Sequence, residues 1–256
     1  MIEVYRIPVS KESLNALPED ERVLLLLLGY VSNQVSMIQK LITFATNRTP
    51  SEEVEKHSTG VQTQMLVRIA AGMMSEAWSL VTKRFIKNKI IANVYIPLLD
   101  PGGKQAFDNL NLKFGQSGLL FNLRNDFCFH YPDDNDVKSA FEAACNDPDS
   151  DGLWSMYLSH HGFNSLFLFS DIIFVYGMGD AAKQQSLSLA HEKIMGEIST
   201  ASVNLIEFSR AFFTAVWKKH FGSEIIAKDV VQIVDAPNVD DVWLPFFVEV
   251  PPPTSC

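Results

Sequence analysis

One short segment of the chain brings together three side chains that could act on a phosphodiester. Residues 124–130 read Arg-Asn-Asp-Phe-Cys-Phe-His, so Arg124, Asn125 and His130 stand in a stretch that is otherwise mostly apolar. An arginine offers a permanent charge and a planar set of donors that matches phosphate oxygens. A histidine can accept or donate a proton near neutral pH. An asparagine can donate to a phosphate or orient the histidine.

These three groups are sufficient for cleavage of an RNA strand without a metal ion. His130 would act as the general base or acid at the ribose 2′-hydroxyl, Arg124 would stabilise charge on the phosphorus, and Asn125 would position the substrate. On a regular α-helix Arg124 and His130 point about 120° apart and lie about 9 Å apart along the axis. The two side chains therefore converge only if the helix unwinds before Pro132 or if two copies of the chain meet.

The segment resembles the signature motif of the HEPN superfamily of α-helical proteins. In that motif an arginine, usually followed by a polar residue, precedes a histidine by a short gap, and here five residues separate Arg124 from His130. Many HEPN proteins form a metal-independent endoribonuclease site across a homodimer and often serve as toxins or phage-defence nucleases. The resemblance implies that Arg124 and His130 are catalytic and that Asn125 assists them.

The resemblance also implies partners: a second copy of the chain, an RNA substrate, and a protein partner such as an antitoxin. In one respect the sequence departs from the family pattern. One HEPN subgroup carries a tyrosine two residues after the histidine, whereas here Pro132 takes that position and Tyr131 directly follows His130. Many HEPN domains are also non-catalytic and only bind partners.

Two further hypotheses need no catalysis. Arg124 could form a salt bridge with Asp133 or Asp134 and His130 could cap the helix end, where a cation is favoured. The chain would then be a non-catalytic helical protein-interaction module, which its acidic balance and aromatic C-terminal tail favour. A weaker third hypothesis is a small-ligand pocket lined by aromatic helices.

Other polar residues add little chemistry. Glu76 could orient Arg124 as a supporting carboxylate, and Tyr131 is the other residue that could support the site. Cys128 is expected to be a buried, inert thiol. The adjacent histidines His160 and His161 do not have the spacing of metal ligands, so we expect neither a metal site nor a cofactor. Four phenylalanines are expected in the core rather than on a surface: Phe163, Phe167, Phe169 and Phe174.

Composition limits the class of protein. The chain has 256 residues, of which 47% are hydrophobic and 20% charged, and its net charge is −9. An acidic chain is not suited to coating nucleic acid, so an RNA-cleaving site would need a local basic pocket. Three scattered cysteines indicate a reducing, cytoplasmic setting. The longest apolar runs are shorter than the about 20 residues of a membrane span, so we expect no membrane association.

Helical periodicity dominates the remaining pattern. Pro18 followed by three acids predicts the start of a long helix, and Ser51 followed by two acids predicts the next. Asp100-Pro101-Gly102-Gly103 reads as a turn, as do Gly177 and Gly179, with Asp180 capping a final helix that Gly222 ends. The expected helices are 18–45, 51–87, 104–114, 119–129, 136–145, 163–176 and 181–220, with a short turn near Ser10 and an extended segment at 230–234.

The expected fold is therefore all-α, an antiparallel bundle of long helices. We expect a HEPN-like helical domain over residues 1–222. The C-terminal arm, residues 223–256, is rich in proline and aromatic residues. We expect this arm to pack on the body of the protein or on a neighbouring subunit.

Overall fold

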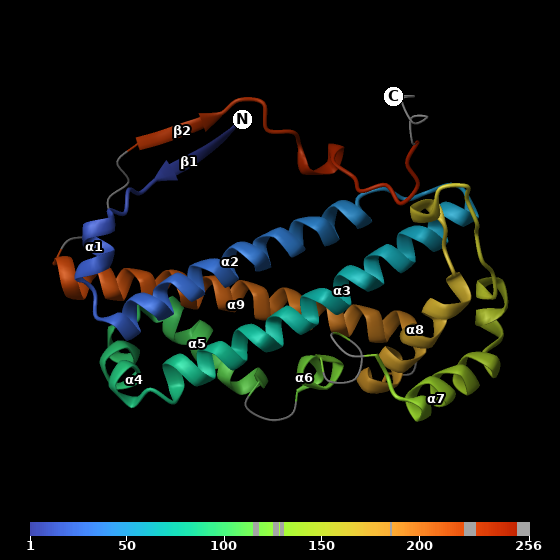
Figure 1. Cartoon of the computed structure of the whole chain (residues 1–256), viewed down its shortest axis with the longest axis horizontal. Coiled ribbons are helices and arrows are strands. Elements are labelled where there is room, and N and C mark those ends of the chain that lie inside the picture. The colour runs from blue at the N-terminus through green and yellow to red at the C-terminus, as the bar shows by residue number, and fades with distance from the viewer. Residues whose placement is uncertain (115–117, 125–127, 129–130, 185, 223–228, 250–256) are drawn as a thin grey trace, which may run out of the picture. The chain divides into compact units, whose positions relative to one another are not determined.

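The computed structural model describes residues 1–114, 118–124, 128, 131–184, 186–222 and 229–249. Helices dominate these residues, which confirms the expected all-α bundle (Figure 1). No described helix combines the length and apolarity needed to cross a membrane. The α-helices are α1 (Lys11–Ala16), α2 (Glu19–Thr46), α3 (Glu53–Val81), α4 (Lys89–Tyr95), α5 (Pro101–Phe114), α6 (Leu119–Leu123), α7 (Asp134–Cys145), α8 (Leu168–Ala182) and α9 (Leu187–Phe221). Shorter elements are the π-helical η1 (Thr82–Ile86), the 3-10 turns η2 (Ile96–Leu98), η4 (Pro148–Leu153), η5 (Gly162–Asn164) and η6 (Val239–Asp241), and the strands β1 (Ile2–Arg6) and β2 (Asp229–Ile233).

The chain divides into two units, each assembled from three separate segments. Unit 1 consists of Met1–Met37, Met73–Gly118 and Ile198–Asn238, and unit 2 of Ile38–Gly72, Leu119–Glu197 and Val239–Cys256. Boundaries between the units fall within the helices α2, α3 and α9. A further boundary follows β2, between Asn238 and Val239. The expected division at residue 222 stays a prediction.

Aromatic rings form the core of unit 1. Phe85 of η1 lies edge-on to Phe208 and Phe212 of α9, with ring centroids 5.2 and 5.7 Å apart. Phe107 of α5 and Tyr95 of α4 extend this cluster, and Phe85, Phe208, Phe212 and Tyr95 are fully buried. Edge-to-face pairs of this kind stabilise a core beyond the burial of their area. The cluster therefore joins four elements that are distant in sequence.

The sequence Asp100-Pro101-Gly102-Gly103 begins a helix rather than forming a free turn. Asp100 Oδ1 accepts a hydrogen bond of 2.7 Å from the Gly103 backbone, so Asp100 acts as the N-cap of α5. Pro101 occupies the first helical position, where its missing N–H costs nothing. A Cβ atom at Gly103 would overlap Ala211 Cβ of α9, so glycine allows the two helices to approach closely. The expected turn is wrong because a cap and a turn use the same residue types.

A carboxylate links three segments of unit 1. Glu21 of α2 is almost buried and accepts hydrogen bonds from the Tyr95 hydroxyl (2.5 Å), from Lys219 Nζ (2.7 Å) and from His220 Nε2 (2.5 Å). Lys219 Nζ also lies 4.8 Å from the centre of the Tyr95 ring. Burial of a charge is costly unless such partners satisfy it. The cluster therefore fixes the start of α2 against α4 and the end of α9.

The same cluster shifts the acidity of its members. Burial by itself raises the pKa of Glu21, but hydrogen bonds from Lys219, Tyr95 and His220 outweigh burial and hold that pKa below its usual range. Burial and the neighbouring carboxylate raise the pKa of the Tyr95 hydroxyl. Because the folded pKa of Glu21 is lower than its unfolded pKa, this carboxylate stabilises the fold above the unfolded value of about 4.3. The contribution is lost as pH falls through the folded pKa.

The two strands of unit 1 form an antiparallel ribbon (Figure 1). Its register places Ile2 opposite Ile233 and Arg6 opposite Asp229, where an ion pair of 3.5 Å closes one end. The extended segment expected at 230–234 is thus confirmed, while its partner strand was not expected. Every residue of both strands is exposed.

In unit 2, α7 packs on α8 through Ala140, Ala144, Ile172 and Tyr176. The expected boundaries are partly wrong here. The helix α8 begins at Leu168 and continues through both glycines at 177 and 179, which the sequence places in a turn. It ends at Ala182, and the next residue, Lys183, has a left-handed φ of 52°.

The last helix also begins later than expected. The helix α9 begins at Leu187 because Ser186, and not Asp180, accepts from the backbone of Leu189. Its expected end is confirmed, since Gly222 directly follows the helix with a φ of 65°. A glycine in this left-handed conformation is the usual way to end a helix.

We predict that Glu21→Gln lowers the free energy of unfolding by about 2–4 kcal/mol at neutral pH, because it removes the charge that satisfies three buried or half-buried donors. The loss should be smaller in acid, since protonation removes the same charge from the wild-type protein. Urea unfolding at several pH values measures both effects. Glu192→Gln, at an exposed site within α9, serves as the control and should change little. An equal loss at every pH would contradict the role of the charge.

Candidate functional site

The structure describes part of the motif predicted from the sequence. The helix α6 ends at Leu123, and Arg124 and Cys128 have π-helical rather than α-helical backbone geometry. Both side chains are half-buried, whereas Tyr131 is 94% exposed. Asn125 and His130 lie outside the described residues. The convergence of Arg124 and His130 therefore stays a prediction.

The residues expected to surround the motif are placed as follows. Glu76 is an exposed residue of unit 1, whereas Arg124 belongs to unit 2, so their pairing stays a prediction. Asp133 is the N-cap of α7, where its Oδ1 accepts from the backbone of Asn135 (2.8 Å) and Asp136 (3.0 Å). The helix therefore begins at Asp134, two residues before the expected start.

A different feature of unit 2 is prominent among the described residues. Tyr157 and Leu166 exchange two backbone hydrogen bonds of 2.7 Å each, as an antiparallel pair does. Successive side chains in such a segment point to opposite faces. Leu166 is buried, and the Tyr157 hydroxyl lies 3.1 Å from His57 Nδ1, so this pair faces the protein. In the next pair along the two segments, Met156 lies opposite Phe167, and both of these side chains must then face solvent.

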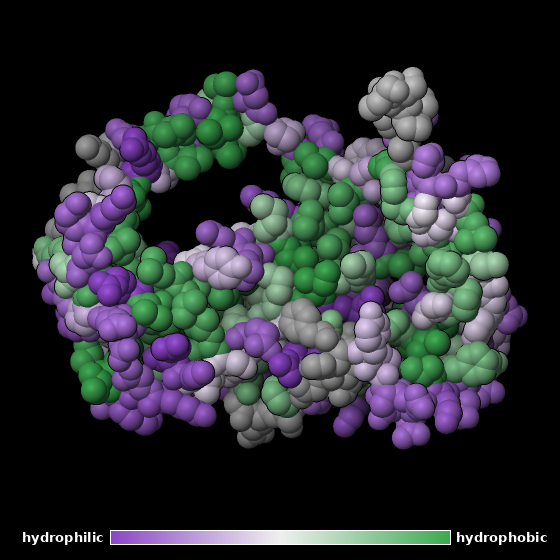
Figure 2. Space-filling view, in the orientation of Figure 1, coloured by the Kyte–Doolittle hydropathy of each residue, from purple (hydrophilic) through white to green (hydrophobic). Residues whose placement is uncertain are grey.

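The outward side chains are apolar. We call them the apolar surface: Trp154, Met156, Leu158, Phe167 and Phe169. Their exposed fractions range from 37% for Trp154 to 66% for Leu158. Figure 2 shows hydrophobic residues at the molecular surface over this part of the chain. Aromatic residues and methionine are the types that enrich the cores of protein interfaces. A cluster of this size on one short segment indicates a binding surface rather than scattered exposure.

The expectation that these phenylalanines belong to the core is wrong for three of the four. Phe163, Phe167 and Phe169 are 63%, 52% and 41% exposed. Phe174, within α8, is half-buried beneath the guanidinium of Arg68, which lies 4.3 Å from its ring centre. Phe167 is exposed because the chain is extended directly before Leu168, where side chains alternate, whereas Phe163 lies in the 3-10 turn η5 and Phe169 in the first turn of α8. The alternation of Trp154, Met156 and Leu158 in the sequence is the signal that could have found the surface.

Hydrogen bonds hold the segment in place. Trp154 Nε1 donates to Ser150 Oγ (3.1 Å), and Ser150 Oγ in turn donates to the Ala144 carbonyl at the end of α7 (2.7 Å). Phe141 of α7 lies edge-on to Trp154, with ring centroids 5.7 Å apart. The position of Trp154 is thus set by α7 and η4. A surface that is already ordered loses less entropy when it binds a partner.

Negative charge lies beside the apolar surface. Residues 131–153, which include α7 and η4, carry seven carboxylates and one lysine, a net charge of −6. Most of these carboxylates are exposed, and Asp149 and Asp151 lie five and three residues before Trp154 in the chain. At physiological salt such charges act over about 8 Å. This part of unit 2 therefore attracts cationic groups and repels phosphates.

Two hollows in unit 2 are candidate ligand sites. One, of about 220 Å³, lies between α7 and α8 and is lined by small residues with two carboxylates, Asp136 and Asp180. The Tyr176 hydroxyl at this hollow already donates to Asp147 (2.7 Å). The other hollow lies beneath the end of the C-terminal arm. Among the described residues no three His, Cys, Asp or Glu side chains are grouped so that they could hold a metal ion.

We predict that residues of the apolar surface contribute little to folding. Met156→Ser and Phe167→Ser should change the free energy of unfolding by less than about 1 kcal/mol, because both side chains stay largely in water. Leu166→Ala, one residue away but buried, should cost about 2–4 kcal/mol. Chemical denaturation measures the three values. Equal losses at positions 166 and 167 would show that the outward face is buried in solution.

Comparisons with known proteins add no assignment: no family model matches the chain, and neither a curated protein nor a solved structure does. The resemblance to HEPN proteins thus rests on residues 124–130 and stays a prediction. The features of this chain that bear on its function are chiefly the apolar surface and the carboxylates beside it.

Proposed function

We propose that this chain is a helical protein-interaction module that binds a cationic, amphipathic segment of a partner protein. The observation that carries the proposal is the apolar surface of residues 154–169 with an acidic region directly beside it. Large apolar side chains supply most of the binding energy in protein interfaces, and complementary charges set the partner and the rate of association. A lysine- or arginine-rich segment with one apolar face matches both features.

The negative charge of residues 131–153 favours this partner over RNA. Binding of a nucleic acid depends on lysine and arginine side chains that release counterions from phosphates. Residues 131–153 follow the motif segment directly and carry only Lys138 as a cation. The local field therefore opposes a polyanion and favours a polycation. A basic peptide is thus the better match for this part of unit 2.

The size of the expected effect follows from the exposed area. Burial of a half-exposed methionine or phenylalanine against a partner contributes about 1 kcal/mol, which is about half the value for full burial of such a side chain. Loss of one such side chain should weaken binding roughly fivefold.

We predict that a synthetic amphipathic peptide of about 18 residues, built from leucine and lysine, binds the full chain and competes with a natural partner. Met156→Ser with Phe167→Ser should weaken its binding at least tenfold. Asp149→Asn with Asp151→Asn should weaken it less and reduce its salt dependence. Fluorescence anisotropy at two salt concentrations measures these changes.

The matched control is Leu112→Ser in α5. Leu112 is 83% exposed, so its substitution removes an apolar side chain of similar size from another surface. This variant should bind the peptide as the wild-type chain does. Binding that ignores positions 156 and 167, or that Leu112→Ser weakens equally, would contradict the proposed surface.

A second candidate is a metal-independent endoribonuclease of HEPN type that acts as a homodimer. One observation favours it: the regular α-helix α6 ends at Leu123, and Arg124 and Cys128 have π-helical backbone geometry. Local π-helical geometry is frequent at functional sites.

For this candidate we predict that purified protein cleaves RNA in the presence of a metal chelator and that His130→Ala abolishes the cleavage. The reason is that the imidazole would carry the proton in the reaction. His160→Ala, at an exposed histidine of the same unit, should leave the rate unchanged. Cleavage measured on a mixed RNA pool decides the matter. An absolute requirement for a divalent ion, or full activity of the His130→Ala protein, would exclude this mechanism.

A further inference from the structure

Residues 239–249, the described end of the C-terminal arm, lie on unit 2 in the manner of a bound peptide. We call them the terminal segment. Asn47, after α2, donates through Nδ2 to the carbonyls of Val239 (2.5 Å) and Val242 (2.8 Å). The Leu244 N–H donates to the Phe44 carbonyl in the last turns of α2 (3.0 Å). These hydrogen bonds are made to the main chain of the terminal segment and not to its side chains.

The other end of the segment is held by one asparagine. Asn164 Nδ2 donates to the Val248 carbonyl (2.7 Å), while the Val248 N–H donates to Asn164 Oδ1 (3.1 Å). An asparagine that makes both bonds to one residue replaces the neighbouring strand of a sheet. The terminal segment is thus recognised at both ends through its backbone.

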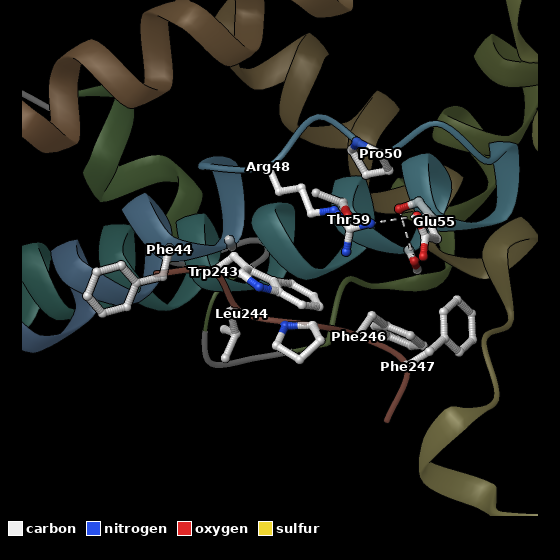
Figure 3. A pocket seen from close by; sticks show the side chains of 12 residues that line it. Phe44, Arg48, Pro50, Glu55, Thr59, Trp243, Leu244, Phe246 and Phe247 are labelled. Atoms are coloured by element: carbon white, nitrogen blue, oxygen red, sulfur yellow. Dashed lines mark hydrogen bonds and ion pairs between the residues drawn. The ribbon is translucent and has the colours of Figure 1, made fainter. Parts of the chain in front are cut away.

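Aromatic contacts fill the space between these ends. The guanidinium of Arg48 lies 4.8 Å from the centre of a Trp243 ring and 4.0 Å from Glu55 (Figure 3). Trp243 nevertheless remains 47% exposed, and a hollow of about 50 Å³ remains between the segment and the ends of α2 and α3. That space can hold a few waters. The segment is therefore well recognised but incompletely packed, as a replaceable ligand is.

The path of the chain favours replacement by an identical segment. The terminal segment belongs to unit 2, whereas the residues directly before it, Ile198–Asn238, belong to unit 1. Residues 234–238, which join the two, contain a turn and no helix or strand. A terminal segment that completes a unit formed by earlier residues can be supplied by another copy with all of its contacts unchanged.

We propose that two copies of this chain exchange their terminal segments, so that the groove of each copy, which we define by Phe44, Asn47, Arg48 and Asn164, receives the terminal segment of the other copy. The occupant is a second copy because its fit is already visible in the contacts above. The exchange uses none of the side chains of the apolar surface and goes beyond the proposed function. At low concentration the copy's own segment fills the groove, because its tether gives it a high effective concentration.

A complementation experiment tests the exchange with full-length chains. One chain carries a defective groove, Asn47→Ala with Arg48→Ala. The other carries a defective segment, Trp243→Ala with Leu244→Pro, which removes the indole and the N–H that binds Phe44. In a mixture, the intact segment of the first chain has only the intact groove of the second to bind.

We expect each variant alone to be mainly monomeric and the equimolar mixture to form a heterodimer at least ten times more tightly. Sedimentation velocity and native mass spectrometry of isotopically distinguished chains measure this. Asn93→Ala, at an exposed asparagine of α4, replaces the groove variant as the control and should give no gain. A mixture that behaves as the sum of its components would overturn the proposal.

A second measurement keeps the test decisive if a variant folds poorly. A photo-reactive residue in place of Phe247 in a light chain is mixed with heavy wild-type chain at high concentration and irradiated. Cross-links between light and heavy chains at residues 44–59 are expected. Cross-links found only within light chains would overturn the exchange. Heterodimers that survive Met156→Ser with Phe167→Ser would separate this result from the fate of the proposed partner surface.

Discussion

The backbone pair of Tyr157 with Leu166 determines which side chains of its segment meet water. Once these two residues exchange their hydrogen bonds, the alternation of side chains leaves no freedom to the residues on either side. The Leu166 side chain is buried, whereas the side chains of Met156 and Phe167 must face solvent. A shift of one residue would exchange the two faces, so the apolar surface and the interior beneath it are specified together. The apolar surface is thus a direct consequence of the register that buries Leu166.

Such a surface has a physical cost that the rest of the molecule offsets. Exposed aromatic and aliphatic groups favour self-association. The net charge of −9, with a net −6 concentrated in residues 131–153, opposes contact between copies at this site. The same carboxylates that keep identical surfaces apart attract a partner of opposite charge. One distribution of charge would therefore keep copies of the chain apart and select the proposed partner.

Much of the fold could be predicted from the sequence, because its longest helices carry clear signals at their ends. The helix α2 begins and ends within one residue of the prediction, and Gly222 ends α9 as expected. The errors occur where one residue type serves two structures. Asp100 reads equally well as part of a turn or as a helix cap, and only the contact of α5 with Ala211 decides between them. The turn expected at the glycines of α8 is wrong for a similar reason, because Gly177 is buried within the helix and Gly179 lies close to Leu187 of α9.

The candidate site was harder to predict. The motif at Arg124 attracts attention because its residue types are suited to catalysis, whereas the apolar surface contains no such residues. Its signal is a period of two, in a stretch that precedes a helix and also contains polar residues. The pairing of Tyr157 with Leu166 joins residues across a loop, and no local propensity specifies that register. Sequence patterns therefore located the elements better than the surface they present.

The missing side chain at Gly103 has a consequence for how this protein can change. The backbone of α5 at Gly103 lies directly against Ala211 Cβ of α9, so even a methyl group would force the two helices apart and separate Phe107 from the rings of α9. Most positions in a core accept a conservative replacement after small adjustments. Here no smaller residue exists and no larger one fits, so any variation in the angle between these two helices must come from other positions. Substitutions that change the packing of the aromatic core of unit 1 must therefore leave Gly103 unchanged.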